Sequence, residues 1–176
     1  MKNGIALIGF MGAGKTAVGR VLAEKLGKEF VELDALIEKK TGKSISEIFE
    51  QDGEIAFREL EIGVTKEVSR RKNLVIACGG GIVLNKINID RLKNEAVVVY
   101  LKTSPGTILK RVSDNSNERP LLKSADKATR IEELLKFRQP FYERAADITI
   151  NTSRLGVAKV AERIIEKLKQ NASIHI

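Results

Sequence analysis

Short apolar runs alternate along the chain with longer stretches that mix apolar and polar residues. Each run has the length of a strand rather than of a helix, and some of them end at glycine. The runs that predict strands are 5–8, 29–33, 74–78, 96–101 and 148–150. Because they are almost continuously apolar, we expect both faces of the resulting sheet to be covered.

The stretches between these runs carry apolar residues at helical spacing. In the first stretch Val18, Leu22 and Leu26 fall on one face, and Gly27 suits a left-handed C-terminal cap. The predicted helices are 15–26, a short helix ending at Thr41, 46–71 with a break at Asp52-Gly53, a helix from about Pro105, 128–139 ended or kinked by Pro140, and 157–168.

Alternating strands and helices predict an α/β fold. We expect a five-stranded parallel sheet flanked by helices, in one domain that spans residues 1–176. The polar segment 114–126 lacks helical periodicity and is predicted to be a mobile loop.

The strongest chemical signal is the run Gly9-Phe10-Met11-Gly12-Ala13-Gly14-Lys15-Thr16 between a predicted strand and a predicted helix. It matches the P-loop pattern in the context that the pattern requires. Its glycines let backbone N–H groups approach phosphate oxygens, and the helix N-terminus adds positive partial charge. Lys15 is expected to bridge the outer phosphates, and the Thr16 hydroxyl is a candidate magnesium ligand.

Two acidic residues, Glu32 and Asp34, end the second predicted strand two positions apart, so both carboxylates should point to one side. In an open parallel sheet this strand end lies beside the P-loop. A carboxylate there could hold magnesium through water, or orient and deprotonate an acceptor hydroxyl.

Two arginines stand in unusual surroundings: Arg58 among predicted core residues and Arg138 beside a predicted helix break. Together with Gly79-Gly80-Gly81 they suggest a pocket for a carboxylate, because the arginine fork binds a carboxylate through two parallel hydrogen bonds. Surface salt bridges are the alternative interpretation of each arginine taken alone.

Composition narrows the range of possible functions and partners. Cys78 is the only cysteine and His175 the only histidine, so an intramolecular disulfide and a Cys/His zinc cluster are both excluded. The apolar run before Cys78 predicts that it lies in the core.

The net charge of +8 is spread along the chain and aromatics are scarce, which argues against a nucleic-acid partner. The apolar run 5–11 is too short to span a bilayer and no other candidate membrane segment is evident, so we expect no membrane partner and a cytoplasmic location. The pattern shows no apolar surface stripe for a partner, so we expect a monomer.

Five patterns together resemble the shikimate kinase family, from about Gly4 to Leu168. They are G-F-M-G-A-G-K-T at 9–16, the F-R within G-E-x-x-F-R-x-x-E at 53–61, G-G-G at 79–81, R-P-L-L at 119–122 and R-x-x-x-Y at 138–142. The acid pair stands between the first two of them. Glu32 is a departure, since many family members have aspartate at this position.

The resemblance implies a P-loop kinase fold in which ATP, with Mg²⁺, phosphorylates the 3-hydroxyl of shikimate to give shikimate 3-phosphate and ADP. It implies a lid at about 112–126 and a substrate-binding helical region at about 34–62. Implied catalytic residues are Lys15, Asp34 and Arg119. Implied nucleotide-binding residues are Gly12, Ala13, Gly14, Lys15, Thr16, Ala17, Arg111, Arg119 and Arg154. Implied shikimate-binding residues are Asp34, Arg58, Gly79, Gly80, Gly81 and Arg138, and implied metal-binding residues are Thr16 and, through water, Glu32.

Three other functions fit parts of the sequence. A kinase for another hydroxylated acid, such as gluconate, would share the fold and the P-loop. A nucleotide-dependent regulatory protein would share the P-loop, but it has no need of Asp34, Arg58 and Arg138 together. A nucleic-acid binder would use the positive charge, and salt-dependent retention on DNA would reveal it.

Overall fold

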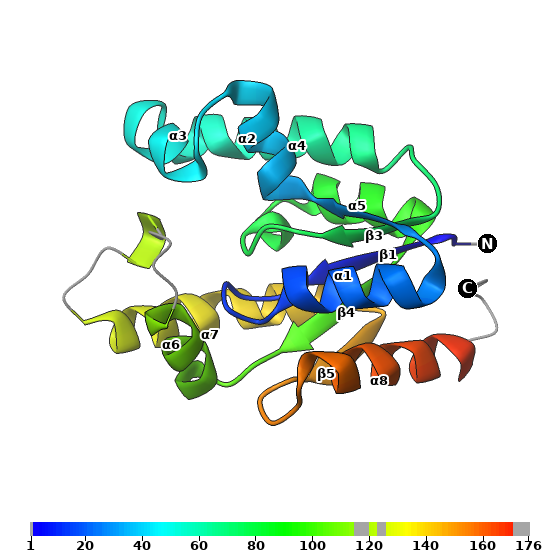
Figure 1. Cartoon of the computed structure of the whole chain (residues 1–176). Coiled ribbons are helices and arrows are strands. Elements are labelled where there is room, and N and C mark those ends of the chain that lie inside the picture. Colours follow the sequence, from blue (N-terminus) through cyan, green and yellow to red (C-terminus); the bar gives the residue numbers. More distant parts are fainter. Residues whose placement is uncertain (1, 115–119, 123–125, 171–176) are drawn as a thin grey trace.

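The computed structural model describes residues 2–114, 120–122 and 126–170. In these ranges the core of the fold is a five-stranded sheet in the order β2-β3-β1-β4-β5, in which every neighbouring pair is parallel (Figure 1). The strands are β1 (Gly4–Ile8), β2 (Glu29–Glu32), β3 (Leu74–Ala77), β4 (Ala96–Lys102) and β5 (Ile148–Asn151). The predicted five-stranded parallel sheet is confirmed.

Helices connect the strands and cover the sheet. They are α1 (Lys15–Leu26), α2 (Leu33–Thr41), α3 (Ile45–Gln51), α4 (Gly53–Val68), α5 (Lys86–Glu95), α6 (Pro105–Ser113), α7 (Lys127–Ala145) and α8 (Val157–Gln170), with short 3₁₀ helices η1 (Ile82–Leu84) and η2 (Pro120–Leu122). Among the described residues, none of these helices has both the length and the apolar composition needed to cross a membrane.

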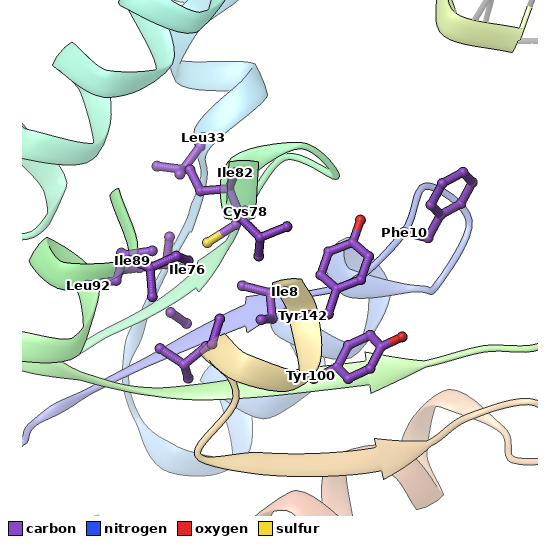
Figure 2. Packing of buried hydrophobic residues seen from close by; sticks show 14 of the residues in the cluster. Ile8, Phe10, Leu33, Ile76, Cys78, Ile82, Ile89, Leu92, Tyr100 and Tyr142 are labelled. Carbon is purple, nitrogen blue, oxygen red and sulfur yellow. The ribbon is translucent and has the colours of Figure 1, made fainter. Parts of the chain in front are cut away.

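The two faces of the sheet carry separate hydrophobic clusters, because side chains alternate along each strand. Ile5 and Leu7 of β1 pack on the face covered by α1 and α8, which lie side by side in Figure 1. Ile8 of β1 and Tyr100 of β4 belong to the cluster on the opposite face, which also holds Cys78 (Figure 2). The prediction that Cys78 is a core residue is confirmed, since the residue is 3% exposed.

Several predicted boundaries differ from the structure, and two of the differences bear on the site. The strand predicted at 29–33 ends at Glu32, and Asp34 lies in the first turn of α2, where a carboxylate is favoured by the helix dipole. Pro140 does not end its helix, because α7 continues to Ala145. Pro140 has no backbone N–H, so one intrahelical hydrogen bond is missing at this position. The residues of α7 after Pro140 are still packed in the core, since Tyr142 and Ala145 are buried.

The polar segment after α6 was predicted to be a mobile lid. Within it the structure describes only η2 and the residues next to α6 and α7, so most of the predicted lid, including Arg119, lies outside the described residues. The helix α5 was not predicted at all: only Ile89 and Leu92 are buried apolar residues in it, Ile87 is exposed, and the other residues are polar.

Candidate active site

The carboxyl ends of the strands meet at one edge of the sheet, and two adjoining cavities open there. The first, which we call the arginine cavity, has a volume of about 570 Å³ and is lined among others by Arg58, Glu61 and Arg138. The second, the P-loop cavity, has a volume of about 820 Å³ and is lined by residues 11–18 and Arg111. The residues that border both cavities are Met11, Glu32, Asp34, Gly79 and Gly80. A molecule in one cavity would therefore lie beside a molecule in the other.

The P-loop forms a tight turn between β1 and α1 (Figure 1). Gly12 and Gly14 have φ angles of 78° and 91°, a region that other residues rarely adopt, so the turn requires glycine at both positions. The Lys15 ammonium group donates to the carbonyl oxygens of Gly9 at 2.8 Å and Phe10 at 2.9 Å. Backbone amides, a helix N-terminus and a lysine thus converge on the cavity, which is the arrangement that binds phosphate groups.

The two residues predicted to bind a metal are in direct contact. Thr16 Oγ1 donates a hydrogen bond of 2.7 Å to Glu32 Oε1, and both residues line the P-loop cavity. Hydroxyl and carboxylate oxygens are hard ligands that suit Mg²⁺ beside a nucleotide. The longer glutamate side chain, at a position where many family members have aspartate, reaches the threonine.

Arg58 on α4 is oriented by two carboxylates. Its Nη1 lies 3.1 Å from Glu61 Oε2, and its Nη2 lies 3.0 Å from Glu54 Oε1. The guanidinium packs directly against Gly81: a Cβ atom at this position would be 2.4 Å from both terminal nitrogens of Arg58. Any side chain at Gly81 would therefore displace the arginine from the cavity.

Gly79 has a similar role for the acids. A Cβ atom there would lie 2.9 Å from Glu61 Oε1 and 3.0 Å from Asp34 Oδ1. The sequence analysis assigned the three glycines, with the two arginines, to a pocket for a carboxylate. In the structure, Gly79 and Gly81 also make room for the side chains of the protein's own site residues.

Arg138 on α7 supplies a second cation. It is only 3% exposed, it lines the arginine cavity, and its Nε is buried without a hydrogen-bond partner in the described part of the chain. Buried polar groups are normally paired, and an arginine N–H at a cavity wall is well suited to an anionic group. Arg58 and Arg138 thus line the same cavity from two different helices.

Glu61 is a site residue that the sequence analysis did not single out. It lies three positions after Arg58 on α4, so the two side chains share a helix face, and it is fully buried. Burial raises the pKa of Glu61 from 4.5 to about 7, and the charge of Arg58 opposes this rise. Its spacing from Arg58 was visible in the sequence, but its burial depends on how α4 packs.

We expect Glu61→Gln to change how stability depends on pH. Because its folded-state pKa is raised, the stability that protonated Glu61 contributes is present below about pH 4.5 and is lost as the pH rises through about 7. Glutamine does not titrate. The free energy of unfolding of the wild type, minus that of the variant, should therefore fall by on the order of 3 kcal/mol between about pH 5 and about pH 8. Denaturant unfolding at both pH values measures it.

Glu54→Gln is the matched control, because Glu54 pairs with the same guanidinium while its side chain is 49% exposed. Its difference from the wild type should stay nearly constant over this range. An equally constant difference for Glu61→Gln would mean that the ion pair with Arg58 keeps Glu61 charged throughout.

The remaining predicted nucleotide-site residues are placed differently. Arg111 on α6 donates to Gly12 O at 3.1 Å and to Thr152 O at 3.5 Å, so it lies across the P-loop. Ala17 also lines the P-loop cavity. Arg154 is exposed in the turn between β5 and α8, next to Leu155, which does line that cavity. A nucleotide-binding role for Arg154 stays a prediction.

Comparison with known proteins decides the family. The family model described as shikimate kinase matches residues 11–169. The chain belongs to the shikimate kinase family. A shikimate kinase from Thermodesulfovibrio yellowstonii is 47% identical over 170 residues, covering 97% of this chain and 96% of the relative. A shikimate kinase from Caldanaerobacter subterraneus subsp. tengcongensis is 48% identical over 165 residues, covering 94% and 95%.

Solved structures agree with this assignment. Shikimate kinase from Acinetobacter baumannii, in complex with shikimate, superposes with a TM-score of 0.93 at 42% identity and covers 98% of this chain and 96% of its own. A sugar kinase from Janibacter at 18% identity has a TM-score of 0.65 and shares the fold alone. The predicted P-loop kinase fold and the resemblance to shikimate kinases are both confirmed.

Proposed function

We propose that the protein transfers the γ-phosphoryl group of ATP to the 3-hydroxyl of shikimate, giving shikimate 3-phosphate and ADP. The observation that carries this proposal is the pair of arginines, Arg58 and Arg138, in a cavity that shares Asp34 with the P-loop cavity. Family membership supports the same substrates. The cavity offers two cations for the carboxylate and one carboxylate for the ring hydroxyls.

In this proposal each residue has a defined task. Arg58 and Arg138 hold the carboxylate and thereby orient the ring. Asp34 accepts the proton of the 3-hydroxyl as the oxygen attacks the γ-phosphorus, and the bond to the bridging oxygen of ADP breaks. Lys15 compensates charge on the outer phosphates, and the P-loop amides hold them in line.

Thr16 and, through water, Glu32 would hold Mg²⁺. The ion, when bound, supplies positive charge to the phosphate oxygens. The region 34–62, which covers most of α2–α4, is the proposed substrate-binding segment, because several of its residues line the arginine cavity. We also propose that the protein acts as a monomer on small molecules, without nucleic acid or membrane. The cytoplasm, where ATP is supplied, is the proposed location.

Release of ADP from ATP and Mg²⁺, with and without shikimate, tests the proposal. Gluconate and quinate serve as parallel acceptors, because they are hydroxylated acids of different shape. Strong stimulation by shikimate alone is the expected result. Stimulation by another acid would keep the kinase but overturn the assignment of the cavity, and no stimulation by any acid would favour a regulatory nucleotide-binding protein.

We expect Glu32→Gln to raise the Mg²⁺ concentration needed for half-maximal rate by roughly 10–100-fold, the usual effect of losing a residue that supports a metal site. Glutamine keeps the length of the side chain and removes its charge. Glu29→Gln on the same strand is the matched control, because Glu29 lies on the exposed surface and pairs with Arg71. An unchanged Mg²⁺ dependence in Glu32→Gln would remove Glu32 from the metal site.

A further inference from the structure

A buried tyrosine on α7 holds the loop that follows β3. The Tyr142 hydroxyl donates a hydrogen bond to the carbonyl oxygen of Gly80, and the residue is fully buried. Its ring stacks on that of Tyr100, with 5.0 Å between ring centroids. Figure 2 shows the two rings together, with their hydroxyl groups pointing in different directions. Tyr142 follows Arg138 by one helical turn of α7. The arginine that lines the cavity and the tyrosine that binds Gly80 therefore lie next to each other on one face of the helix.

The bond fixes a peptide group that has unusual freedom. Gly80 and Gly81 both lack a side chain, so the peptide between them can rotate at little cost. All peptide bonds in the described ranges are trans, and in a trans peptide the C=O and the N–H point in opposite directions. Holding the Gly80 oxygen toward Tyr142 therefore directs the Gly81 N–H to the other side of the loop.

That other side is the arginine cavity. Gly79, Gly80 and Gly81 line the cavity, whereas Tyr142 does not. The Tyr142 hydroxyl therefore contacts the loop on the side away from the cavity. Among the described residues no backbone oxygen accepts the Gly81 N–H. The guanidinium of Arg58 packs against Gly81, and both line the arginine cavity, so an N–H group directed to this side would meet a carboxylate held by Arg58 and Arg138.

We propose that Tyr142 is a positioning residue for the acid substrate: its hydrogen bond to Gly80 turns the Gly81 N–H toward the carboxylate held by Arg58 and Arg138. The inference rests on the proposed function, because it assumes that the carboxylate of shikimate occupies this cavity. Burial raises the pKa of the Tyr142 hydroxyl, with the nearby Arg138 charge opposing the rise, so the hydroxyl keeps the proton that it donates.

Tyr142→Phe tests the proposal, since it removes the hydroxyl and keeps the stacked ring. We expect the KM for shikimate to rise roughly tenfold, the worth of one hydrogen bond of ordinary strength, while the KM for ATP stays near the wild-type value. Tyr100→Phe is the matched control: it removes a hydroxyl from the partner ring, which does not line the arginine cavity. It should leave both KM values unchanged.

A second readout does not depend on how much of the variant folds. The ratio of kcat/KM for shikimate to kcat/KM for its methyl ester, measured within each protein, reports the preference for a free carboxylate. This ratio should shrink roughly tenfold in Tyr142→Phe and stay constant in Tyr100→Phe. An unchanged ratio, or equal increases of both KM values in Tyr142→Phe, would overturn the proposal and leave Tyr142 a packing residue. Failure of the wild type to respond to shikimate would instead contradict the proposed function.

Discussion

Replacing Asp34 with asparagine should lower kcat by roughly 10²–10⁴-fold, the usual contribution of a positioned general base. Asparagine has nearly the same shape and can still form hydrogen bonds with ring hydroxyls, but it cannot accept their proton at neutral pH. Asp34 borders both the arginine cavity and the P-loop cavity, which is the position that a base between acceptor and phosphate must occupy. ADP release at saturating shikimate and ATP measures the change.

Asp90→Asn is the matched control, because Asp90 lies on α5 and pairs with Lys86 at the surface. Its kcat should equal that of the wild type. If Asp34→Asn retained the wild-type kcat and raised only the KM for shikimate, Asp34 would be a binding residue and the proton would leave by another route.

The position of Asp34 also illustrates what local sequence patterns can establish. The sequence correctly predicted that Glu32 and Asp34 lie at the carboxyl edge of the sheet. The order of strands along the chain and the position of ligand sites in parallel sheets are enough for this prediction. The argument from strand alternation was wrong, since β2 ends at Glu32 and Asp34 belongs to α2. Both residues nevertheless border the same cavities, because the first turn of α2 continues directly from the strand end.

Features that depend on packing between distant elements were missed. Glu61 was visible in the sequence only as the last residue of the pattern at 53–61, and its burial arises where α4 meets the loop after β3. Pro140 was expected to end or kink its helix from its local preference, and α7 continues past it. The bond from Tyr142 to Gly80 joins residues 62 positions apart, which no periodicity in the sequence reports.

The P-loop, by contrast, was fully predictable. Its pattern is contiguous, and its glycines, lysine and threonine have their roles within a single turn between β1 and α1. The same holds for α1, whose bounds were predicted to the residue. The local sequence pattern therefore located the predicted phosphate site, and only the assembled fold showed how Arg58, Arg138 and the glycine loop form one cavity beside it.

Lys15→Ala should lower kcat by roughly 10²–10³-fold, because the variant loses a positive charge that acts on the phosphate oxygens as the transferred group moves. Lys15 donates to two carbonyl oxygens of the P-loop, so part of the loss could come from a disturbed loop. Lys15→Met separates the two causes: it keeps most of the side-chain length and removes the charge. Both variants should lose activity to a similar extent and keep the melting temperature of the wild type within a few degrees.

Lys25→Ala is the matched control, because Lys25 is an exposed lysine in the last turn of the same helix. Its rate should be that of the wild type. If Lys15→Ala kept the wild-type kcat in the presence of shikimate, the P-loop would not be the site of phosphoryl transfer. If Lys15→Met kept it while Lys15→Ala lost it, Lys15 would act by supporting the loop, and the charge on the phosphates would have to be balanced by other groups of the P-loop cavity.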